Sequence, residues 1–334
     1  MIFGLTRFLL LCLVCTVGWT PVLGAPAKAA APSRSSGRDY VLVTQWAKAN
    51  SLKVRWLKKN ETLELSSATT KIILHIRSPE AQFNAVAVRL LFPLIHRNGS
   101  VFISQLDVRH TFQPLLYPPR LRPGRSVKSI CLDPGHGGRD PGYQIGSNQE
   151  KKFNLLLAQE LRDQLQRQGW KVTLTRNSDS FLDLPKRPDL ARRRKADLFV
   201  SLHFNAASPF PGSVQGAEVY CMTPVGAASS NARGVGGNAG AFPGNQFNDE
   251  NMALAYQLQK SLTRGVPAQD RGVHRARFSV LRDATMPAVL VEPGFLSHPV
   301  EGRKIMTAAY RRQIAKAIAD GLLAYKQLVE RPRK

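Results

Sequence analysis

Ser129-Ile-Cys-Leu-Asp-Pro-Gly-His-Gly-Gly138 joins a short apolar run to a glycine-rich turn. Residues 129–132 have the composition of a buried strand, and residues 150–168 carry apolar side chains at helical spacing. A second β-prone run, at 171–175, follows the glycine that ends this helix. The order strand, helix, strand is typical of a parallel sheet that is covered by helices.

The same alternation continues to the end of the chain. We expect further strands at 197–202, 217–222 and 288–291, further helices at 189–195 and 251–263, and a closing helical region at 303–329. The sequence therefore predicts an α/β fold for residues 126–334, with three layers (α/β/α) around a mainly parallel sheet.

Residues 39–117 have a different character, because short β-prone runs alternate with turn residues. Asn98-Gly99 between two such runs is a strong hairpin signal. A small, mostly β domain is therefore predicted ahead of the α/β domain. Three prolines and a glycine within residues 118–125 indicate the linker between the two.

The N-terminus has the pattern of a secretory signal peptide. Arg7 precedes an apolar run at 8–17, and small residues around position 24 offer a cleavage point. Residues 25–38 are rich in Ala, Pro and Ser, which is typical of a flexible tether. We therefore expect a signal peptide at 1–24, export to the periplasm or to the cell wall and exterior, and no membrane span in the mature chain.

The chain of 334 residues is strongly basic, with 47 Lys and Arg against 23 Asp and Glu and a formal net charge of +24. This charge predicts a polyanionic neighbourhood, which nucleic acid, acidic lipid or a carboxylate-rich cell wall would provide. Because an exported protein leaves the compartment that holds genomic DNA, we expect no nucleic-acid partner and favour the wall or the envelope.

Polar side chains follow three of the predicted strands, where each strand ends. His136, His203 and Glu292 hold these positions, and Glu150 opens the first long helix. Because the carboxyl ends of parallel strands meet at one edge of a sheet, two imidazoles and two carboxylates should converge there. Two His and one carboxylate, with a fourth position open, are a common way to hold a catalytic zinc ion. A further carboxylate nearby would supply proton transfers.

Other residues allow more than one interpretation. Asn205 either orients His203, holds substrate, or is a plain turn residue after the strand. Cys131 and Cys221 each lie in an apolar, strand-like run, where a buried structural thiol is expected, although a single bridge between them stays open. Residues 225–250 are rich in Gly, Ala and Asn and are expected to form a mobile loop.

Four motifs in order resemble those of the zinc-dependent N-acetylmuramoyl-L-alanine amidases of peptidoglycan turnover: Leu132-Asp-Pro-Gly-His-Gly-Gly138, Glu150, Ser201-Leu-His-Phe-Asn-Ala206 and Val291-Glu-Pro-Gly-Phe-Leu-Ser297. The resemblance covers residues 126–326. It implies that His136, Glu150 and His203 bind one Zn²⁺ and that Glu292 is the general base and acid. It also implies hydrolysis of the amide bond between N-acetylmuramic acid and L-alanine in peptidoglycan.

The first domain resembles a different family. Tyr40-Val-Leu-Val-Thr-Gln-Trp46 and Phe102-Ile-Ser-Gln-Leu-Asp107 make residues 39–117 similar to the N-terminal stalk domain of copper amine oxidases. This domain carries no catalytic grouping, so we expect it to anchor or position the enzyme at the envelope.

Two other functions remain open at this stage. The metal site alone also fits another zinc amidohydrolase of the envelope, either a peptidase that acts on stem peptides or a deacetylase. A non-catalytic wall-binding protein would be favoured if a metal ligand were missing, and all four residues are present. The sequence leaves undecided the stem peptide, any activator, the envelope layer and the oligomeric state.

Overall fold

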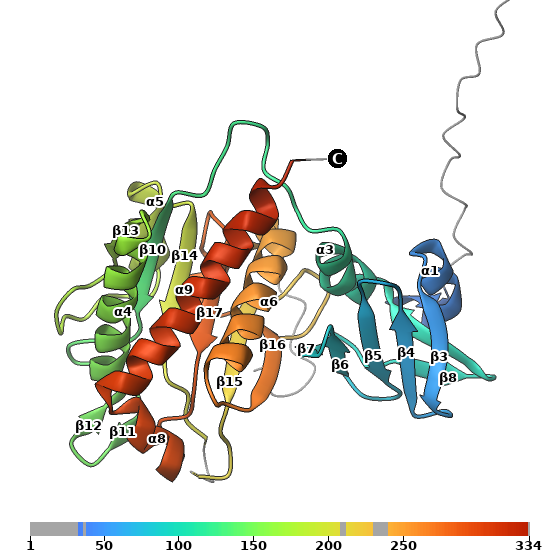
Figure 1. Ribbon diagram of the computed structural model, residues 1–334, viewed down its shortest axis with the longest axis horizontal. Helices are drawn as coiled ribbons and strands as arrows, with labels where there is room; N and C mark the ends of the chain where they lie inside the picture. The colour runs from blue at the N-terminus through green and yellow to red at the C-terminus, as the bar shows by residue number, and fades with distance from the viewer. Residues whose placement is uncertain (1–32, 36–37, 208–211, 230–239, 333–334) are drawn as a thin grey trace, which may run out of the picture. The chain divides into compact units, whose positions relative to one another are not determined.

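The computed structural model describes residues 33–35, 38–207, 212–229 and 240–332 (Figure 1). The predicted signal peptide at 1–24 lies outside these residues, as does most of the predicted tether at 25–38. The described part of the tether includes strand β1 (Ser33–Ser35), which pairs antiparallel with β2 (Arg38–Leu42). From Pro32 onwards the chain forms one compact unit.

Six strands form the sheet of the α/β part, in the order β13-β10-β14-β17-β15-β16. Their bounds are Ser129–Pro134 for β10, Lys171–Leu174 for β13, Leu198–Leu202 for β14, Ala217–Met222 for β15, Asp270–Ala276 for β16 and Ala288–Glu292 for β17. Neighbouring strands run parallel, except that β15 is antiparallel to β17. The carboxyl ends of β10, β14 and β17 therefore share one sheet edge with the amino ends of β15 and β16. The predicted mainly parallel α/β sheet is confirmed.

Helices cover both faces of this sheet. Helices α4 (Glu150–Arg167), α6 (Asn248–Gly265) and α9 (Ala308–Glu330) lie side by side on one face (Figure 1). The short helices α5 (Lys186–Arg193) and α7 (Ser279–Arg282) pack on the other face. Strand side chains alternate accordingly, because Ile130 and Leu132 enter the core under the long helices whereas Cys131 enters the smaller core beside α5 and α7. The three-layer prediction is confirmed.

Some predicted element bounds are wrong. The predicted closing helical region at 303–329 begins earlier, at Pro299, and comprises two helices, α8 (Pro299–Ile305) and α9, the second of which is capped by the side chain of Thr307. The helix predicted at 189–195 is α5, which begins at Lys186. The predicted loop at 225–250 ends in a 3₁₀-helix, η2 (Pro243–Phe247), and the first residues of α6, and its residues 230–239 lie outside the described ones.

The N-terminal part is mostly β, as predicted. Its strands after β2 are β3 (Lys53–Lys58), β4 (Thr62–Ser66), β5 (Lys71–His75), β6 (Glu80–Phe83), β7 (Val86–Arg89), β8 (Ile95–Arg97) and β9 (Ser100–Ser104). The predicted hairpin joins β8 to β9, and its turn residues Asn98 and Gly99 have φ of 49° and 70°. The helical segments α1 (Val43–Ala49), α2 (Gln105–Asp107), η1 (Val108–Phe112) and α3 (Gln113–Leu116) were not predicted.

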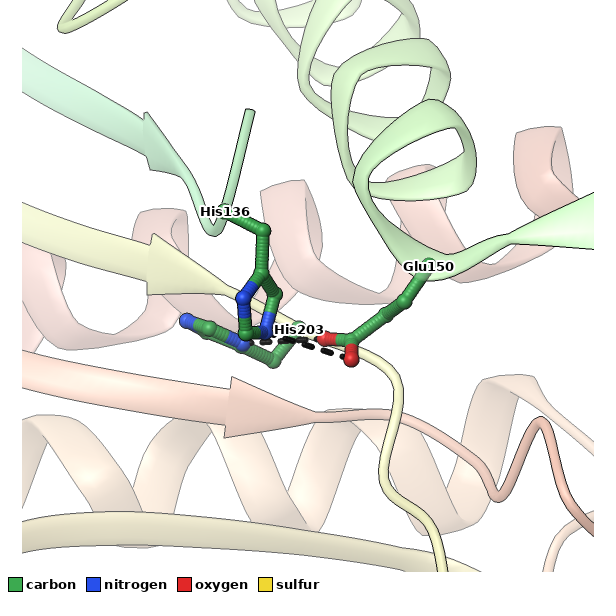
Figure 2. A group of neighbouring side chains, drawn as sticks. All are labelled: His136, Glu150 and His203. Carbon is green, nitrogen blue, oxygen red and sulfur yellow. Dashed lines mark hydrogen bonds and ion pairs between the residues drawn. The ribbon is translucent and has the colours of Figure 1, made fainter. Parts of the chain in front are cut away.

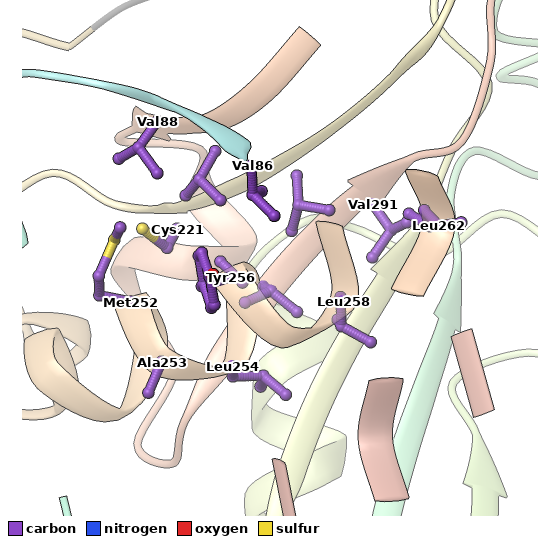
Figure 3. Packing of buried hydrophobic residues seen from close by; sticks show 14 of the residues in the cluster. Val86, Val88, Cys221, Met252, Ala253, Leu254, Tyr256, Leu258, Leu262 and Val291 are labelled. Atoms are coloured by element: carbon purple, nitrogen blue, oxygen red, sulfur yellow. The ribbon is translucent and has the colours of Figure 1, made fainter. Parts of the chain in front are cut away.

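One sheet runs through both parts of the chain. Strand β7 pairs in parallel with β16 at Val88 and Val273, which makes an 11-stranded sheet that ends at β3. Figure 3 shows Val86 and Val88 of β7 facing the same core as Tyr256 of α6. The Tyr256 hydroxyl donates a 3.0 Å hydrogen bond to the Phe83 carbonyl. Residues 118–125, the predicted linker, contain no helix or strand.

A two-stranded ribbon of β11 (Gln144–Ile145) and β12 (Asn148–Gln149) precedes α4.

Among the described helices, none combines the length and the apolar character that crossing a membrane requires.

Candidate metal centre

The shared sheet edge carries four of the predicted site residues. His136 comes two residues after β10, His203 comes directly after β14, and Glu292 is the last residue of β17. Glu150 is the first residue of α4. Figure 2 shows the rings of His136 and His203 close to the Glu150 carboxylate. The fold therefore brings residues from four separate segments of the chain to one place.

Glu150 bridges the two imidazoles. Its Oε2 lies 3.2 Å from Nε2 of His136, and its Oε1 lies 3.0 Å from Nδ1 of His203. The ring centroids are 4.9 Å apart, with the planes at 80° to each other. One ligand atom from each of the three side chains lies within 4.8 Å of the others. A single ion at the roughly 2 Å distances that zinc takes with N and O ligands could reach all three.

Two glycines make room for this cluster. A Cβ atom on Gly135 would lie 2.1 Å from Cε1 of His203, and one on Gly142 would lie 2.5 Å from Oε2 of Glu150. Neither position can carry a side chain without moving a ligand. The glycine-rich turn is therefore needed for the close approach of the protein's own side chains to one another.

Asp140 fixes the orientation of the His136 ring. Its Oδ2 lies 2.8 Å from Nδ1 of His136, which leaves Nε2 facing Glu150. His136 itself has φ of 59°, a conformation that few non-glycine residues adopt. Carboxylates that bind the second nitrogen of a metal-ligating imidazole are common, because they orient the ring and raise its basicity.

Two buried arginines hold the backbone of the same turn. Arg176 donates hydrogen bonds of 2.9 and 2.8 Å to the carbonyls of Pro134 and Gly135. Arg187 donates a 2.9 Å hydrogen bond to the His136 carbonyl and forms a 3.0 Å ion pair with Asp133. These bonds stabilise the unusual backbone at His136.

The charges at this cluster favour an ionised Glu150. Burial by itself acts to raise the pKa of Glu150, but the hydrogen bonds and charges of His136 and His203 outweigh it and lower that pKa. Burial acts to lower the pKa of His136, and the carboxylates of Glu150 and Asp140 raise it overall. The imidazoles and carboxylates thus stabilise each other's charged forms, and a bound cation would take the place of the imidazole protons beside Glu150.

Glu292 lines a cavity together with two of the three clustered residues. The cavity has a volume of about 520 Å³, and its lining includes His136, His203 and Glu292 as well as apolar residues such as Phe278 and Leu290. The Oε2 atom of Glu292 is buried and has no hydrogen-bond partner among the described residues. Burial, and then the charges of Glu150 and Glu218, raise the pKa of Glu292 well above its usual range.

Asn205 bonds neither to the imidazole of His203 nor to the metal ligands. Its side-chain amide donates a 2.6 Å hydrogen bond to Oε1 of Glu218. Its backbone forms a bridge with Phe295, in the segment that follows Glu292. Among the described residues, Asn205 therefore connects the end of β14 to the start of β15, beside the cavity.

The remaining His and Cys residues lie away from the three ligands. The His274 ring packs against Tyr220 at a centroid distance of 5.3 Å, and His298 caps α8 by accepting a hydrogen bond from the Glu301 amide. Cys131 and Cys221 are buried free thiols whose side chains belong to the cores on opposite faces of the sheet. The disulfide bridge left open by the sequence is therefore not formed.

Sequence reasoning missed Asp140, Asp133 and Glu218 as parts of the site. Asp140 had a signal, because it lies four residues after His136 within the same glycine-rich turn. Asp133 and Glu218 had none, since each is a carboxylate at the end of an otherwise apolar strand and acquires its role from partners far along the chain.

The residues present fit a zinc ion. Two imidazole nitrogens and one carboxylate form the donor set, Asp140 supports one imidazole, and the side toward Glu292 opens into the cavity. Three protein ligands with an open fourth position are the usual arrangement of a catalytic zinc site.

Comparison with known proteins gives two family matches. The model for N-acetylmuramoyl-L-alanine amidases matches residues 130–324, and that for the copper amine oxidase N-terminal domain matches residues 22–113. Both matches fall on the segments that carry the two resemblances found in the sequence, which are thereby confirmed.

Individual relatives agree with the first match. N-acetylmuramoyl-L-alanine amidase AmiC of Neisseria meningitidis serogroup B is 39% identical over 235 residues, which are 62% of this chain and 55% of that protein. The Escherichia coli amidase AmiA is 33% identical over 232 residues, 62% of this chain and 79% of that protein. The chain thus spans only about half the length of the Neisseria relative.

Among solved structures, amidase AmiC2 of Nostoc punctiforme superimposes with a TM-score of 0.51 and 31% identity. The superposition covers 61% of this chain and 99% of that one. An amidase from Clostridium difficile 630 gives the same TM-score and identity over 60% and 97% of the two chains.

Proposed function

The chain belongs to the N-acetylmuramoyl-L-alanine amidase family, and on that premise we propose that it is a zinc hydrolase of peptidoglycan. The bond cleaved is the amide between N-acetylmuramic acid and the L-alanine of the stem peptide. The observation that carries this proposal is the cluster of His136, Glu150 and His203, whose ligand atoms lie within 4.8 Å of one another beside the cavity that Glu292 lines.

His136, Glu150 and His203 would hold the ion, which lowers the pKa of a bound water and polarises the scissile carbonyl. Glu150 would contribute its negative charge to the cation, and Asp140 keeps the His136 ring in place. The arginines Arg176 and Arg187 hold the backbone of the turn that carries His136. The chain thus supplies a prearranged set of ligands, so that little rearrangement is needed when the ion binds.

Glu292 is the proposed general base and acid. Its Oε2 is buried without a hydrogen-bond partner among the described residues, and Glu292 lines the cavity that the two imidazoles also line. The raised pKa of Glu292 suits a group that first accepts a proton from water and then delivers it to the amine of the leaving L-alanine. Asn205 would support this segment through its backbone bridge to Phe295.

The proposed location is the periplasm or the cell wall, reached through the signal peptide at 1–24. The excess of basic residues, +24 overall, suits a carboxylate-rich polymer. The N-terminal part would position the enzyme at the envelope.

Two measurements on the purified protein test the proposal. Elemental analysis should find one zinc per chain, and digestion of purified sacculi should release intact stem peptides that begin with L-alanine, as identified by mass spectrometry. Cleavage within the stem peptide would identify a peptidase, and release of acetate would identify a deacetylase. Either outcome would refute the amidase assignment.

A further inference from the structure

We propose that the cavity between β7 and β16 is a second subsite, which binds the C-terminal carboxylate of the stem peptide. This inference rests on the proposed function, because it concerns the far end of the same substrate. The cavity has a volume of about 360 Å³ and is lined by residues of β5, β6, β7 and β16, including His75, Arg89, Arg271 and His274.

The second cavity lies on the same face of the sheet as Glu292. Side chains of a strand alternate between the faces, and Leu290 belongs to the core beside α5 and α7, so Glu292 points to that face as well. Tyr220 of β15 packs against His274 of β16 and against Phe278, which lines the catalytic cavity. A continuous row of side chains therefore connects the two cavities.

The part of the cavity that lies on the N-terminal strands β6 and β7 is lined according to the same alternation of side chains. The side chains of Val86 and Val88 of β7 are buried in the core under α6, and the exposed Arg89, the next residue in sequence, belongs to the opposite face and lines the cavity. Likewise, the exposed residues Glu80 and Gln82 of β6 flank the buried Ala81 and line the cavity. The subsite exists only because β7 and β16 join the two parts of the chain (Figure 1).

The spacing of the strands matches the length of a stem peptide. Three strand-to-strand steps lead from β17, through β15 and β16, to β7. At about 4.8 Å a step, these span about 14 Å. An extended peptide covers about 3.3–3.6 Å per residue, so about four residues bridge the distance. A stem peptide whose L-alanine lies beside Glu292 would therefore place its C-terminus near Arg89.

Two guanidinium groups line the cavity, those of Arg271 and Arg89. Arg271 is held by its 2.9 Å ion pair with Glu218 and by packing over Phe295, so its position is fixed. Arg89 forms no ion pair with any described residue, although Glu80 lies opposite it in the β6–β7 register. The unpaired guanidinium of Arg89 is therefore the anion-binding group, because guanidinium binds carboxylate with charge-assisted hydrogen bonds.

The carboxylate of Asp270 also lines the cavity and is held by two hydrogen bonds. Its Oδ2 accepts a 2.8 Å hydrogen bond from the Ala87 amide, and its Oδ1 accepts a 2.7 Å hydrogen bond from Gln259. Asp270 thus ties β16 to the Ala87 amide of β7 and to Gln259 of α6, so its position at the cavity is fixed.

The test compares three muramoyl peptides with the zinc-loaded full-length protein. One carries a dipeptide, one a tetrapeptide with a free C-terminal carboxylate, and one the same tetrapeptide with a C-terminal amide. We expect kcat/KM for the free acid to exceed that for the amide about tenfold, mainly through KM. Arg89→Gln should abolish this difference and leave hydrolysis of the dipeptide unchanged.

Arg97→Gln is the matched control, since Arg97 is also an exposed arginine of the N-terminal strands but does not line the cavity. It should keep the preference for the free acid. A wild-type protein that hydrolyses acid and amide equally, or an Arg89→Gln protein that keeps the preference, would overturn the subsite. Failure of the wild-type protein to hydrolyse any of the three substrates would instead count against the proposed function.

Discussion

Glu218 lies opposite Glu292 in the antiparallel register of β15 and β17. The two carboxylates have opposite environments. Asn205, Tyr220 and Arg271 bond to Glu218 at 2.6, 2.8 and 2.9 Å, whereas Oε2 of Glu292 has no partner among the described residues. The Glu218 carboxylate is thus fixed by hydrogen bonds. Oε2 of Glu292 is left available for proton transfer, and the negative charge of Glu218 raises the pKa of Glu292.

Glu218→Gln should therefore shift the pH dependence of the enzyme. The charge of Glu218 is one of the causes that raise the pKa of Glu292, so its removal should lower that pKa. A base with a lower pKa is deprotonated at lower pH, so the acidic limb of kcat/KM should move to lower pH. Glu160→Gln on α4 should leave the limb in place, because Glu160 neither lines the cavity nor is among the charges that raise the pKa of Glu292. A limb that moves to higher pH would contradict the coupling.

Asp140→Asn should weaken zinc binding without removing a ligand. The substitution keeps the size of the side chain but removes the negative charge of the carboxylate that contacts Nδ1 of His136. Loss of such a partner typically costs 10–100-fold in metal affinity. Competition with a chelator measures the affinity, and His136→Ala, which removes a proposed ligand, should lose stoichiometric zinc altogether. Unchanged affinity in Asp140→Asn would show that the ring is oriented by other contacts.

Arg187→Met should destabilise the fold. The Arg187–Asp133 pair is buried on both sides, with 2% and 0% of the side chains exposed, so the substitution leaves a buried carboxylate without its cation. Breaking such a pair costs about 3–5 kcal/mol, which urea unfolding would measure. Arg192→Met on the same helix is the control, because the Arg192–Asp189 pair is exposed and should contribute less than about 1 kcal/mol.

The residues predicted from sequence share a local signal. His136, His203 and Glu292 each end an apolar run, and strand ends in a parallel sheet meet at one edge. The alternation of strands and helices was also predicted from the sequence, because apolar residues recur at a spacing that differs between strands and helices.

What the sequence did not reveal depends on contacts between distant residues. Val88 and Val273 pair across 185 positions of sequence, and nothing local to either strand specifies that pairing. The helices after β9 were missed because they are short turns of helix, stabilised by Asp107, which accepts hydrogen bonds from the Leu91 amide and from Thr111. Arg187 belongs to a basic helix, and only the fold shows that its side chain is buried against Asp133.

Removal of residues before Ser126 tests the continuity of the sheet. The shortened chain would expose Val273 and Tyr256, which are 1% and 4% exposed in the full chain. We expect a clearly lower melting temperature, because each large apolar side chain contributes about 1.5–3 kcal/mol when buried. The folded fraction should still hydrolyse a muramoyl dipeptide, since the proposed ligands and Glu292 all follow Ser126. A shortened chain as stable as the full one would show that the β7–β16 contact adds little.

Glu292→Gln should first change the stability of the zinc-free protein. The pKa of Glu292 is raised in the folded state, so the folded protein holds this proton more tightly than the unfolded chain does. The group therefore lowers the free energy of unfolding as pH rises above its usual pKa of about 4.5. Glutamine does not titrate, so the variant should be more stable than the wild type near neutral pH and lose this advantage below pH about 4. Thermal melts in chelator at both pH values measure the difference.

The same substitution separates the proton-transfer role of Glu292 from metal binding. The ion requires only three protein ligands and a fourth, open position, and His136, Glu150 and His203 supply the three. Glu292→Gln should therefore keep full zinc content by elemental analysis. Loss of the proton acceptor should lower kcat by about 10²–10⁴-fold with little change in KM, because general acid–base help acts in the transition state. Wild-type turnover would refute the role, whereas loss of zinc as complete as in His136→Ala would make Glu292 a ligand instead.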